Sequence, residues 1–186
     1  MEIYLVRHTT PSIGKGICYG QSNLPLAKGY QKEMAVTMDL LPQKLDAVYT
    51  SPLVRCRTFA FELSENNIVD QRLLELNFGD WELIEWKNIA QNDLDHWMEN
   101  YVDSAPPKGE SYKALAERVL SFWNETIQTQ HEQIAIVCHA GPIRALLAHV
   151  LNLDLQDSFK LVLDYGSVSR VDINQGHFSI KYINKT

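Results

Sequence analysis

Three short apolar runs, each followed by a stretch with helical periodicity, limit the folds open to this chain. The runs cover residues 3–6, 46–50 and 134–138. Because they are continuous and do not alternate with polar residues, they are typical of strands covered on both faces. Helices are expected at residues 27–41, 54–63, 112–127 and 142–151, the last with Pro142 at its first position. This order predicts an α/β protein, a three-layer α/β/α sandwich with a mostly parallel central sheet and helices on both faces.

The remaining segments fit around such a sheet. Residues 168–173 and 177–183 predict a terminal hairpin joined by Asn174-Gln175-Gly176. Residues 72–109 hold three of the four tryptophans and predict a cap-like excursion over the carboxyl edge of the sheet, with the tryptophans packing the cap. Since the chain has 186 residues and no evident linker, we expect a single domain over residues 1–186.

Charge and composition exclude several partners. The chain has 17 Lys and Arg against 23 Asp and Glu, a net charge of −6, whereas nucleic acids and anionic membranes require a basic footprint. No apolar run approaches the ~18 residues of a membrane span, and residues 3–6 fall short of the roughly 7–15 residues of a secretion signal. The three cysteines have no paired spacing, which predicts reduced thiols. We expect a cytoplasmic protein that binds neither nucleic acid nor membrane.

Residues able to bind a phosphate group follow each of the three predicted strands. Arg7 and His8 follow the first strand, Arg55 follows the second, and His139 and Gly141 follow the third at the start of a helix. In an open α/β sheet, ligands bind outside the carboxyl ends of the strands, and a helix N-terminus there favours an anion. We therefore expect two histidines and two arginines to converge on one point.

This combination of side chains suits phosphoryl transfer to or from a small-molecule phosphate monoester. A guanidinium is a permanently charged, planar fork that matches phosphate oxygens. A neutral imidazole can attack phosphorus, and a second imidazole can stabilise the transition state. A carboxylic acid must also protonate the leaving oxygen. The other histidines lack such a setting and are expected to be structural or solvated: His96, His131, His149 and His177.

Five segments, in order along the chain, resemble the signature motifs of the histidine phosphatase superfamily, also called phosphoglycerate mutase-like. They are LVRHTTP at residues 5–11, TSPLVRCRT at 50–58, Glu75 with GDWE at 79–82, PKGES at 107–111 and VCHAGPIR at 137–144. Any one of these motifs is weak, but the ordered set is specific. The resemblance covers residues 3 to about 170 and implies a phosphoglycerate mutase-like fold.

The resemblance also implies a role for each residue. His8 would be the nucleophile that becomes phosphohistidine, and Arg7, Arg55 and His139 would bind and stabilise the phosphoryl group. Glu75 would be the acid for the leaving group and then the base that activates water. Such enzymes need no metal or other cofactor, so the resemblance predicts none.

Departures from the family pattern bear on the substrate. The glycine usual after the nucleophile is Thr9, and the asparagine usual six residues past it is Gly14. Thr9 and the segment 17–21 (ICYGQ) are similar to the α-ribazole-5′-phosphate phosphatases of cobalamin nucleotide-loop assembly, which implies that substrate; a broad-specificity phosphatase remains the alternative. The candidate substrate-binding residues are Thr9, Thr10, Gln21, Ser22 and Gly141.

Other functions remain open from the sequence. A phosphoglycerate mutase would need further cations for a second phosphate, and residues 77–103 contain one lysine and no arginine. Cys138, Gly141 and Arg144 fit the C-x-x-G-x-x-R pattern of cysteine-based phosphatases, although Pro142 removes an N–H that such a loop would use. A non-catalytic phosphate-binding module and a metal site at His8 and His139 are weaker alternatives, the latter because short metal-ligand spacings are missing.

Overall fold

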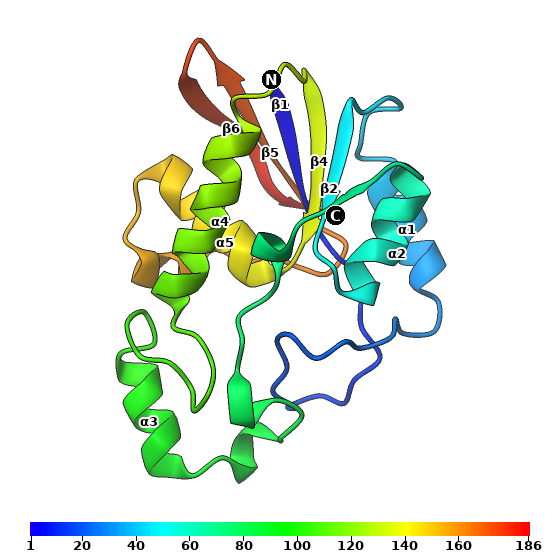
Figure 1. The fold of residues 1–186 in the computed structure, drawn as a ribbon. Coiled ribbons are helices and arrows are strands. Elements are labelled where there is room, and N and C mark those ends of the chain that lie inside the picture. The colour runs from blue at the N-terminus through cyan, green and yellow to red at the C-terminus, as the bar shows by residue number, and fades with distance from the viewer.

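The computed structural model describes residues 1–186 and contains a six-stranded sheet with the strand order β3-β2-β4-β1-β5-β6. The first four strands in this order run parallel, and β5 and β6 are antiparallel additions at one edge (Figure 1). The mostly parallel sheet predicted from the sequence is thereby confirmed. The strands are β1 (Glu2–Arg7), β2 (Ala47–Thr50), β3 (Ile68–Val69), β4 (Gln133–Cys138), β5 (Val168–Asn174) and β6 (His177–Lys185).

Helices cover both faces of the sheet, which makes three layers. Two helices, α4 and α5, lie on one face, and α1 and α2 lie on the other (Figure 1). Strand side chains alternate between the two cores: Ile3 and Leu5 pack in the first cluster, and Tyr4 and Val6 in the second. This double burial explains the continuous apolar runs. The helices are α1 (Tyr30–Met38), α2 (Val54–Leu63), α3 (Gln91–Glu99), α4 (Tyr112–Thr126) and α5 (Ala140–Leu151).

Two predicted helix boundaries were wrong. The first helix begins after Gly29, whose φ of 86° is left-handed, and ends at Met38, so it is shorter than residues 27–41. The last helix begins at Ala140 with His139 as its N-cap, which puts Pro142 at the third helical position and not the first. Proline is tolerated there because the first four N–H groups of a helix have no partner within it. The helix therefore starts immediately after the strand-end histidine.

The terminal hairpin has the predicted form. Its two turn residues, Gln175 and Gly176, have φ values of 49° and 81°. Positive φ at both central positions is the geometry of a type I′ turn, which matches the twist of paired strands. The hairpin places β5 directly beside β1 and so extends the sheet at this edge.

The excursion lies beyond the carboxyl ends of the parallel strands (Figure 1). It contains two short 3-10 turns, Gly79–Trp81 and Trp86–Asn88, and α3, a helix that the sequence did not predict. Trp97 packs against Trp81 and Trp86 with ring centroids 5.7 and 6.3 Å apart, and against Phe78 at 5.8 Å. The tryptophans therefore form a small core of their own.

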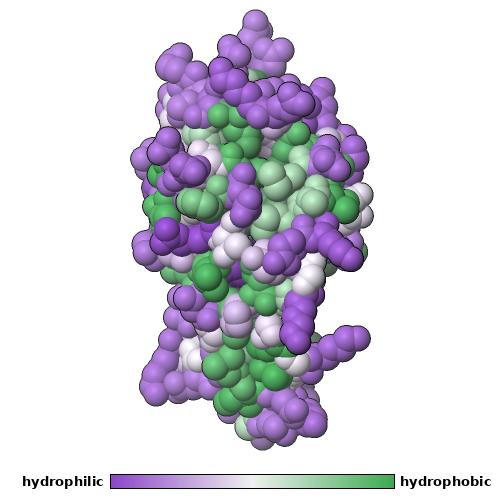
Figure 2. Space-filling model, turned by 90° about the vertical axis from the view of Figure 1, so that its right-hand side faces the viewer, coloured by the Kyte–Doolittle hydropathy of each residue, from purple (hydrophilic) through white to green (hydrophobic).

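Apolar side chains also reach the surface on the flank that carries α1 and α2. They lie in groups with hydrophilic residues around them, and a further group lies on the narrower lower part of the molecule (Figure 2). Val36 and Phe61 are each more than half exposed on these two helices. No helix is both long and apolar enough to cross a membrane.

Candidate active site

The residues predicted to converge do lie together at the carboxyl ends of the central strands. His8 follows β1, Arg55 is in the first turn of α2, and His139 follows β4. All three side chains are buried. The two imidazole centroids are 5.0 Å apart, and Nε of Arg55 is 3.2 Å from Nε2 of His8.

The hydrogen bonds of His8 fix its tautomer. Its Nδ1 lies 2.7 Å from the carbonyl oxygen of Thr9, which can only accept, so Nδ1 carries the proton. On the other side, the Nε–H of Arg55 donates to Nε2. Burial, with the nearby charges of Arg55 and Arg7, holds the pKa of His8 well below its usual value. Nε2 is therefore unprotonated, and its lone pair accepts the hydrogen bond from Arg55.

Two arginines supply that cationic centre. The terminal nitrogens of Arg55 donate to the carbonyl oxygens of Gly20 at 2.6 Å and Ser22 at 2.7 Å, which fixes the plane of the guanidinium. Arg7 donates to the carbonyl of Leu163, and its guanidinium carbon lies 3.8 Å from the ring centroid of Tyr165. Nε of Arg7 is buried and has no protein partner. An unsatisfied buried donor is costly, and an anion bound here would satisfy it.

The His139 side chain is held by contacts with Ser51 and Cys56. Its Nε2 is 2.7 Å from Oγ of Ser51, and Sγ of Cys56 lies 3.5 Å from the same nitrogen. Burial, followed by the charge of Arg55, holds the pKa of His139 well below its usual value. As the N-cap of α5, His139 stands at the positive end of a helix dipole. The site therefore combines two neutral imidazoles with two guanidinium groups.

The carboxylate of Glu75 lies at the start of α5. It accepts hydrogen bonds from the backbone N–H of Leu76 at 2.9 Å and of Gly141 at 3.1 Å. A Cβ built on Gly141 would overlap Oε1 of Glu75, so only glycine lets the carboxylate approach the helix. The N–H of Gly141, predicted to contact substrate, is bonded to Glu75 in this structure.

Comparisons with known proteins agree with this geometry. The sequence pattern of the histidine phosphatase superfamily (branch 1) matches residues 3–186. The chain belongs to the histidine phosphatase superfamily. The membership predicted from the five motifs is thereby confirmed.

The relatives of this phosphatase carry several names. The adenosylcobalamin/alpha-ribazole phosphatase of Escherichia coli is 29% identical, over 99% of this chain and 96% of the relative. The probable phosphoglycerate mutase GpmB of Proteus mirabilis is 31% identical, over 92% and 85%. The phosphoserine phosphatase 1 of Hydrogenobacter thermophilus is 25% identical, over 86% and 79%.

Solved structures of phosphatases are also similar to this chain. The alpha-ribazole phosphatase from Shigella flexneri superposes with a TM-score of 0.90 at 26% identity, over 100% of this chain and 96% of the other. The phosphoglycerate mutase-like fold is confirmed by this likeness. Together, the superfamily match and the relatives named as phosphatases make the chain a hydrolase of phosphoric monoesters.

Of the other residues predicted to bind substrate, Thr9 has a free hydroxyl, whereas Thr10, Gln21 and Ser22 are hydrogen-bonded to other residues of the protein. The Thr9 side chain is buried, and its hydroxyl has no partner. The backbone N–H of Thr10 donates to Glu33, and the amide of Gln21 donates to the carbonyl oxygen of Glu75 at 3.0 Å. The hydroxyl of Ser22 donates to Glu82. Gln21 and Ser22 therefore brace the site in this structure and leave Thr9 with a free hydroxyl.

Sequence reasoning missed two tyrosines at the site. The phenol groups of Tyr19 and Tyr165 are hydrogen-bonded to each other. The Tyr165 ring lies 5.6 Å from the ring of His8, and the Tyr19 ring lies 5.6 Å from the guanidinium carbon of Arg55. These tyrosines stand on two loops that are 146 residues apart. No spacing in the sequence signals such a pair.

A small cavity of about 90 Å³ lies beside Glu75. It is lined mainly by aromatic and apolar groups together with one cation: Glu75, Leu76, Phe78, Tyr112, Gly141, Arg144 and Phe159. The guanidinium of Arg144 lies 5.0 Å from the Phe159 ring, and its Nε donates to the carbonyl of Leu161 at 3.1 Å. This position adjoins the proposed acid, where a leaving group has to fit.

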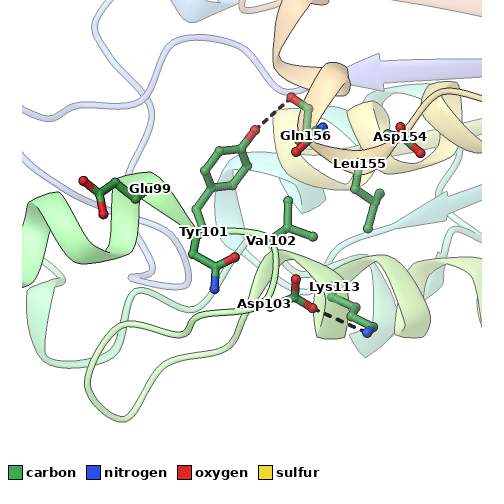
Figure 3. A pocket seen from close by; sticks show the side chains of 9 residues that line it. Glu99, Tyr101, Val102, Asp103, Lys113, Asp154, Leu155 and Gln156 are labelled. Carbon is green, nitrogen blue, oxygen red and sulfur yellow. Dashed lines mark hydrogen bonds and ion pairs between the residues drawn. The ribbon is translucent and has the colours of Figure 1, made fainter.

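A larger cavity, of about 420 Å³, lies elsewhere, between the end of α3 and the segment before β5 (Figure 3). Tyr101 bridges its sides by donating to the carbonyl oxygen of Gln156 at 2.8 Å, and Lys113 pairs with Asp103. None of the residues predicted for the site lines it. The predicted site residues lie together at the strand ends and not in this larger cavity.

The alternatives raised by the sequence find little support in the geometry. The thiol of Cys138 is fully buried, and burial raises its pKa well above the usual value, so it is not a thiolate. No group of three or more histidine, cysteine, aspartate or glutamate side chains is arranged to hold a metal ion. The guanidinium of Arg55 is hydrogen-bonded to His8, and its charge helps to lower the pKa of His139, so it opposes the binding of a cation at these two histidines.

Proposed function

We propose that this phosphatase hydrolyses its substrate through a phosphohistidine at His8. The observation that carries the proposal is the fixed tautomer of His8: Nδ1–H is tied to the Thr9 carbonyl, and the Nε2 lone pair faces Arg55. A buried imidazole with a lowered pKa is unprotonated at neutral pH and so is available as a nucleophile.

The reaction would proceed in two balanced steps. Nε2 of His8 attacks phosphorus, the ester P–O bond breaks, and Glu75 gives its proton to the leaving oxygen. Glu75, now a carboxylate, takes a proton from water, whose oxygen attacks phosphorus while the P–Nε2 bond breaks. Arg7, Arg55 and His139 stabilise the charge of the phosphoryl oxygens in both steps. Glu75 serves both steps because it lies between the helix start and the leaving-group cavity.

Hydrolysis, and not mutase activity, is favoured by the excursion. A mutase must bind a second phosphate and keep water from the phosphoenzyme. Between Asn77 and Asp103 the only cation is Lys87, which is exposed and paired with Glu85 at 2.9 Å. No second cationic cluster faces the site from this segment. Incubation with phosphoglycerates should release inorganic phosphate; isomerisation without release would instead favour the mutase.

We further propose α-ribazole 5′-phosphate as the substrate, which places the enzyme in cobalamin nucleotide-loop assembly. Thr9 and the segment 17–21 support this, as does a relative named adenosylcobalamin/alpha-ribazole phosphatase at 29% identity. The aromatic lining of the cavity beside Glu75 suits a substrate that carries an aromatic base. The test compares kcat/KM for α-ribazole 5′-phosphate, phosphoserine, sugar phosphates and nucleotides. The proposal expects a clear preference for the first; equal rates would make the enzyme broad in specificity.

We also propose where in the cell the enzyme acts and how many domains it has. We place the enzyme in the cytoplasm, since Cys18, Cys56 and Cys138 are all free and buried, as in a reducing compartment. We also treat residues 1–186 as one domain, because β1, near the start of the chain, lies between β4 and β5 in the sheet.

A further inference from the structure

The backbone that carries Glu75 has an unusual source of hydrogen bonds. Residues 72–77 form the start of the excursion, from the 3-10 turn Gln71–Leu73 onward, and lie outside every strand of the sheet, so their carbonyl groups have no partners in a strand ladder. Buried or half-buried carbonyl groups need donors. Arg118, on α4, donates to the carbonyl oxygens of Arg72 at 2.7 Å, Leu74 at 2.8 Å and Glu75 at 3.0 Å. The Arg118 side chain thus supplies the hydrogen bonds that a neighbouring strand would otherwise donate to these carbonyl groups.

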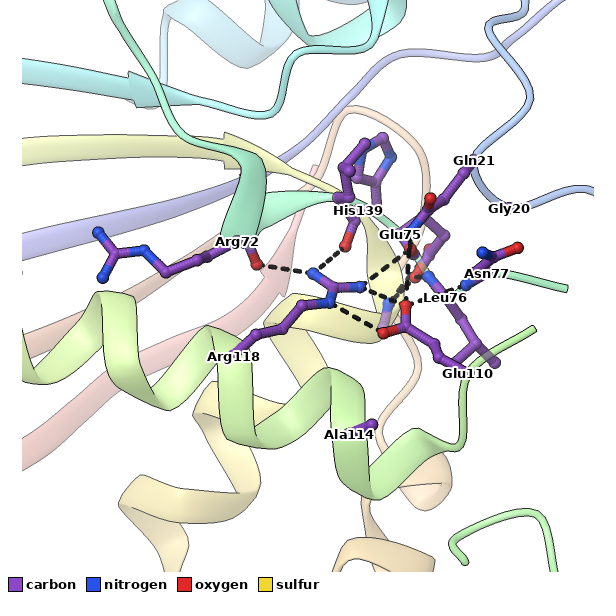
Figure 4. A network of polar contacts seen from close by, with 12 residues as sticks. Gly20, Gln21, Arg72, Glu75, Leu76, Asn77, Glu110, Ala114, Arg118 and His139 are labelled. Atoms are coloured by element: carbon purple, nitrogen blue, oxygen red, sulfur yellow. Dashed lines mark hydrogen bonds and ion pairs between the residues drawn. The ribbon is translucent and has the colours of Figure 1, made fainter. Parts of the chain in front are cut away.

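The same guanidinium is fixed by Glu110. Nε and one terminal nitrogen of Arg118 bond the two carboxylate oxygens at 3.0 and 2.6 Å. The carboxylate of Glu110 also accepts from the backbone N–H of Asn77 at 3.0 Å. Arg118 has five N–H donors, and the five hydrogen bonds use all of them. The result is a ring of polar contacts around the segment 72–77 (Figure 4).

We propose that Arg118, held by Glu110, is a positioning residue for the proton transfer of Glu75; this rests on the proposed role of Glu75. With no donor free, Arg118 cannot bind the phosphate itself. It sets where the backbone of Glu75 lies relative to Gly141, whose N–H orients the carboxylate. Proton transfer requires hydrogen-bond reach of the leaving oxygen, and a displacement of about 1 Å is costly to such a step.

Two substrates with different leaving groups can distinguish a positioning role of Arg118 from a merely structural one. An alkoxide such as the 5′ oxygen of a sugar phosphate must be protonated as it departs, whereas p-nitrophenolate leaves without a proton. The quantity to compare is kcat/KM, which reports on steps up to departure of the leaving group and not on the later attack by water. We expect R118Q to lower kcat/KM about 10- to 100-fold for ribose 5-phosphate. For p-nitrophenyl phosphate we expect the loss to be less than about threefold.

Controls keep the test independent of folding. R72Q removes an arginine on the same segment whose side chain bonds only outward, to Asp70, Glu125 and Ser121, and should leave both rates near normal. Inhibition by vanadate reports on the phosphate-binding residues and should persist in R118Q. If R118Q does not fold, R118K is used, because it keeps the charge and loses the fork. Equal losses with both substrates, or no loss with either, would overturn the proposal.

A double variant distinguishes failure of the positioning role from failure of the acid. If Arg118 acts through Glu75, the kcat/KM of E75Q/R118Q for ribose 5-phosphate should equal that of E75Q. A further loss of about tenfold in the double variant would overturn the positioning role alone. An E75Q variant that treats both substrates like the native enzyme would overturn the acid itself and the positioning role with it.

Discussion

Nε of Arg55 donates to Nε2 of His8 across 3.2 Å. This contact requires an unprotonated Nε2, since a guanidinium can only donate. The Nδ1 bond to the Thr9 carbonyl demands the complementary proton. The resting enzyme therefore holds His8 as the neutral tautomer that a nucleophile needs, before any substrate arrives.

The buried neutral histidines make stability depend on pH. Both His8 and His139 have a lowered pKa in the folded chain, so below about pH 6.5 the unfolded chain binds more protons than the folded one. The free energy of unfolding should therefore fall as pH falls through this range, by at most about 1.4 kcal/mol per pH unit for each histidine. Denaturant titrations from pH 7.5 to 5 measure the slope. The H139Q variant should flatten it; an unchanged slope would mean that His139 does not contribute.

Gly141 is predicted to be intolerant of a side chain. In G141A the new Cβ would overlap Oε1 of Glu75 and displace the carboxylate from the helix start. We expect kcat/KM for ribose 5-phosphate to fall at least about tenfold, with a much smaller loss for p-nitrophenyl phosphate. G14A is the matched control, because its Cβ would meet only the flexible side chain of Ile17. Native rates in G141A would show that the carboxylate position does not matter.

The cavity beside Glu75 should select the leaving group. Phe159 forms part of its wall and packs edge-on against Tyr112, with ring centroids 5.2 Å apart. F159A should raise KM for α-ribazole 5′-phosphate by about three- to tenfold, because an aromatic contact is lost. KM for ribose 5-phosphate, which has no aromatic base, should change little. Steady-state kinetics with both substrates checks this, and an equal rise for both would place the base elsewhere.

Cys138 is expected to be inert in the reaction. Its thiol is fully buried beside the first turn of α5, and burial keeps it protonated. C138A should therefore retain kcat within about twofold, with a modest loss of stability from the small cavity that the substitution leaves. The same kinetics on H8A provide the contrast. Loss of turnover in C138A with turnover retained in H8A would assign the nucleophile to the thiol.

Much of the fold could be predicted because its strands are buried on both faces. Continuous apolar runs at Ile3–Val6 and Ile134–Cys138 identified the central strands, and their ends located His8 and His139. Helix ends were less predictable, because Pro142 fits either the first or the third helical position. The excursion helix α3 has nine residues, none of them buried. Its apolar residues, Leu94, Trp97 and Met98, span little more than one helical turn, which is too short a pattern to identify a helix from the sequence.

The supports of the site could not be read from the sequence. The contacts of Arg118 with the segment 72–75 join residues at least 43 positions apart. The hydrogen bond between Tyr19 and Tyr165 is more distant still. Such contacts depend on how α4 and the loops are placed in space, and a single sequence gives no periodicity for them. Strand-end residues are different, because the topology alone brings them together.

The central claim is that His8 carries the phosphoryl group. Rapid acid-free quenching of the enzyme with labelled α-ribazole 5′-phosphate or p-nitrophenyl phosphate, followed by digestion and mass spectrometry, locates the modified residue. We expect an acid-labile phosphate on the peptide that contains His8, absent in H8A and longer-lived in E75Q, which lacks the base for water attack. A phosphate on Cys138, or a turnover-competent enzyme in which His8 is never modified, would contradict it.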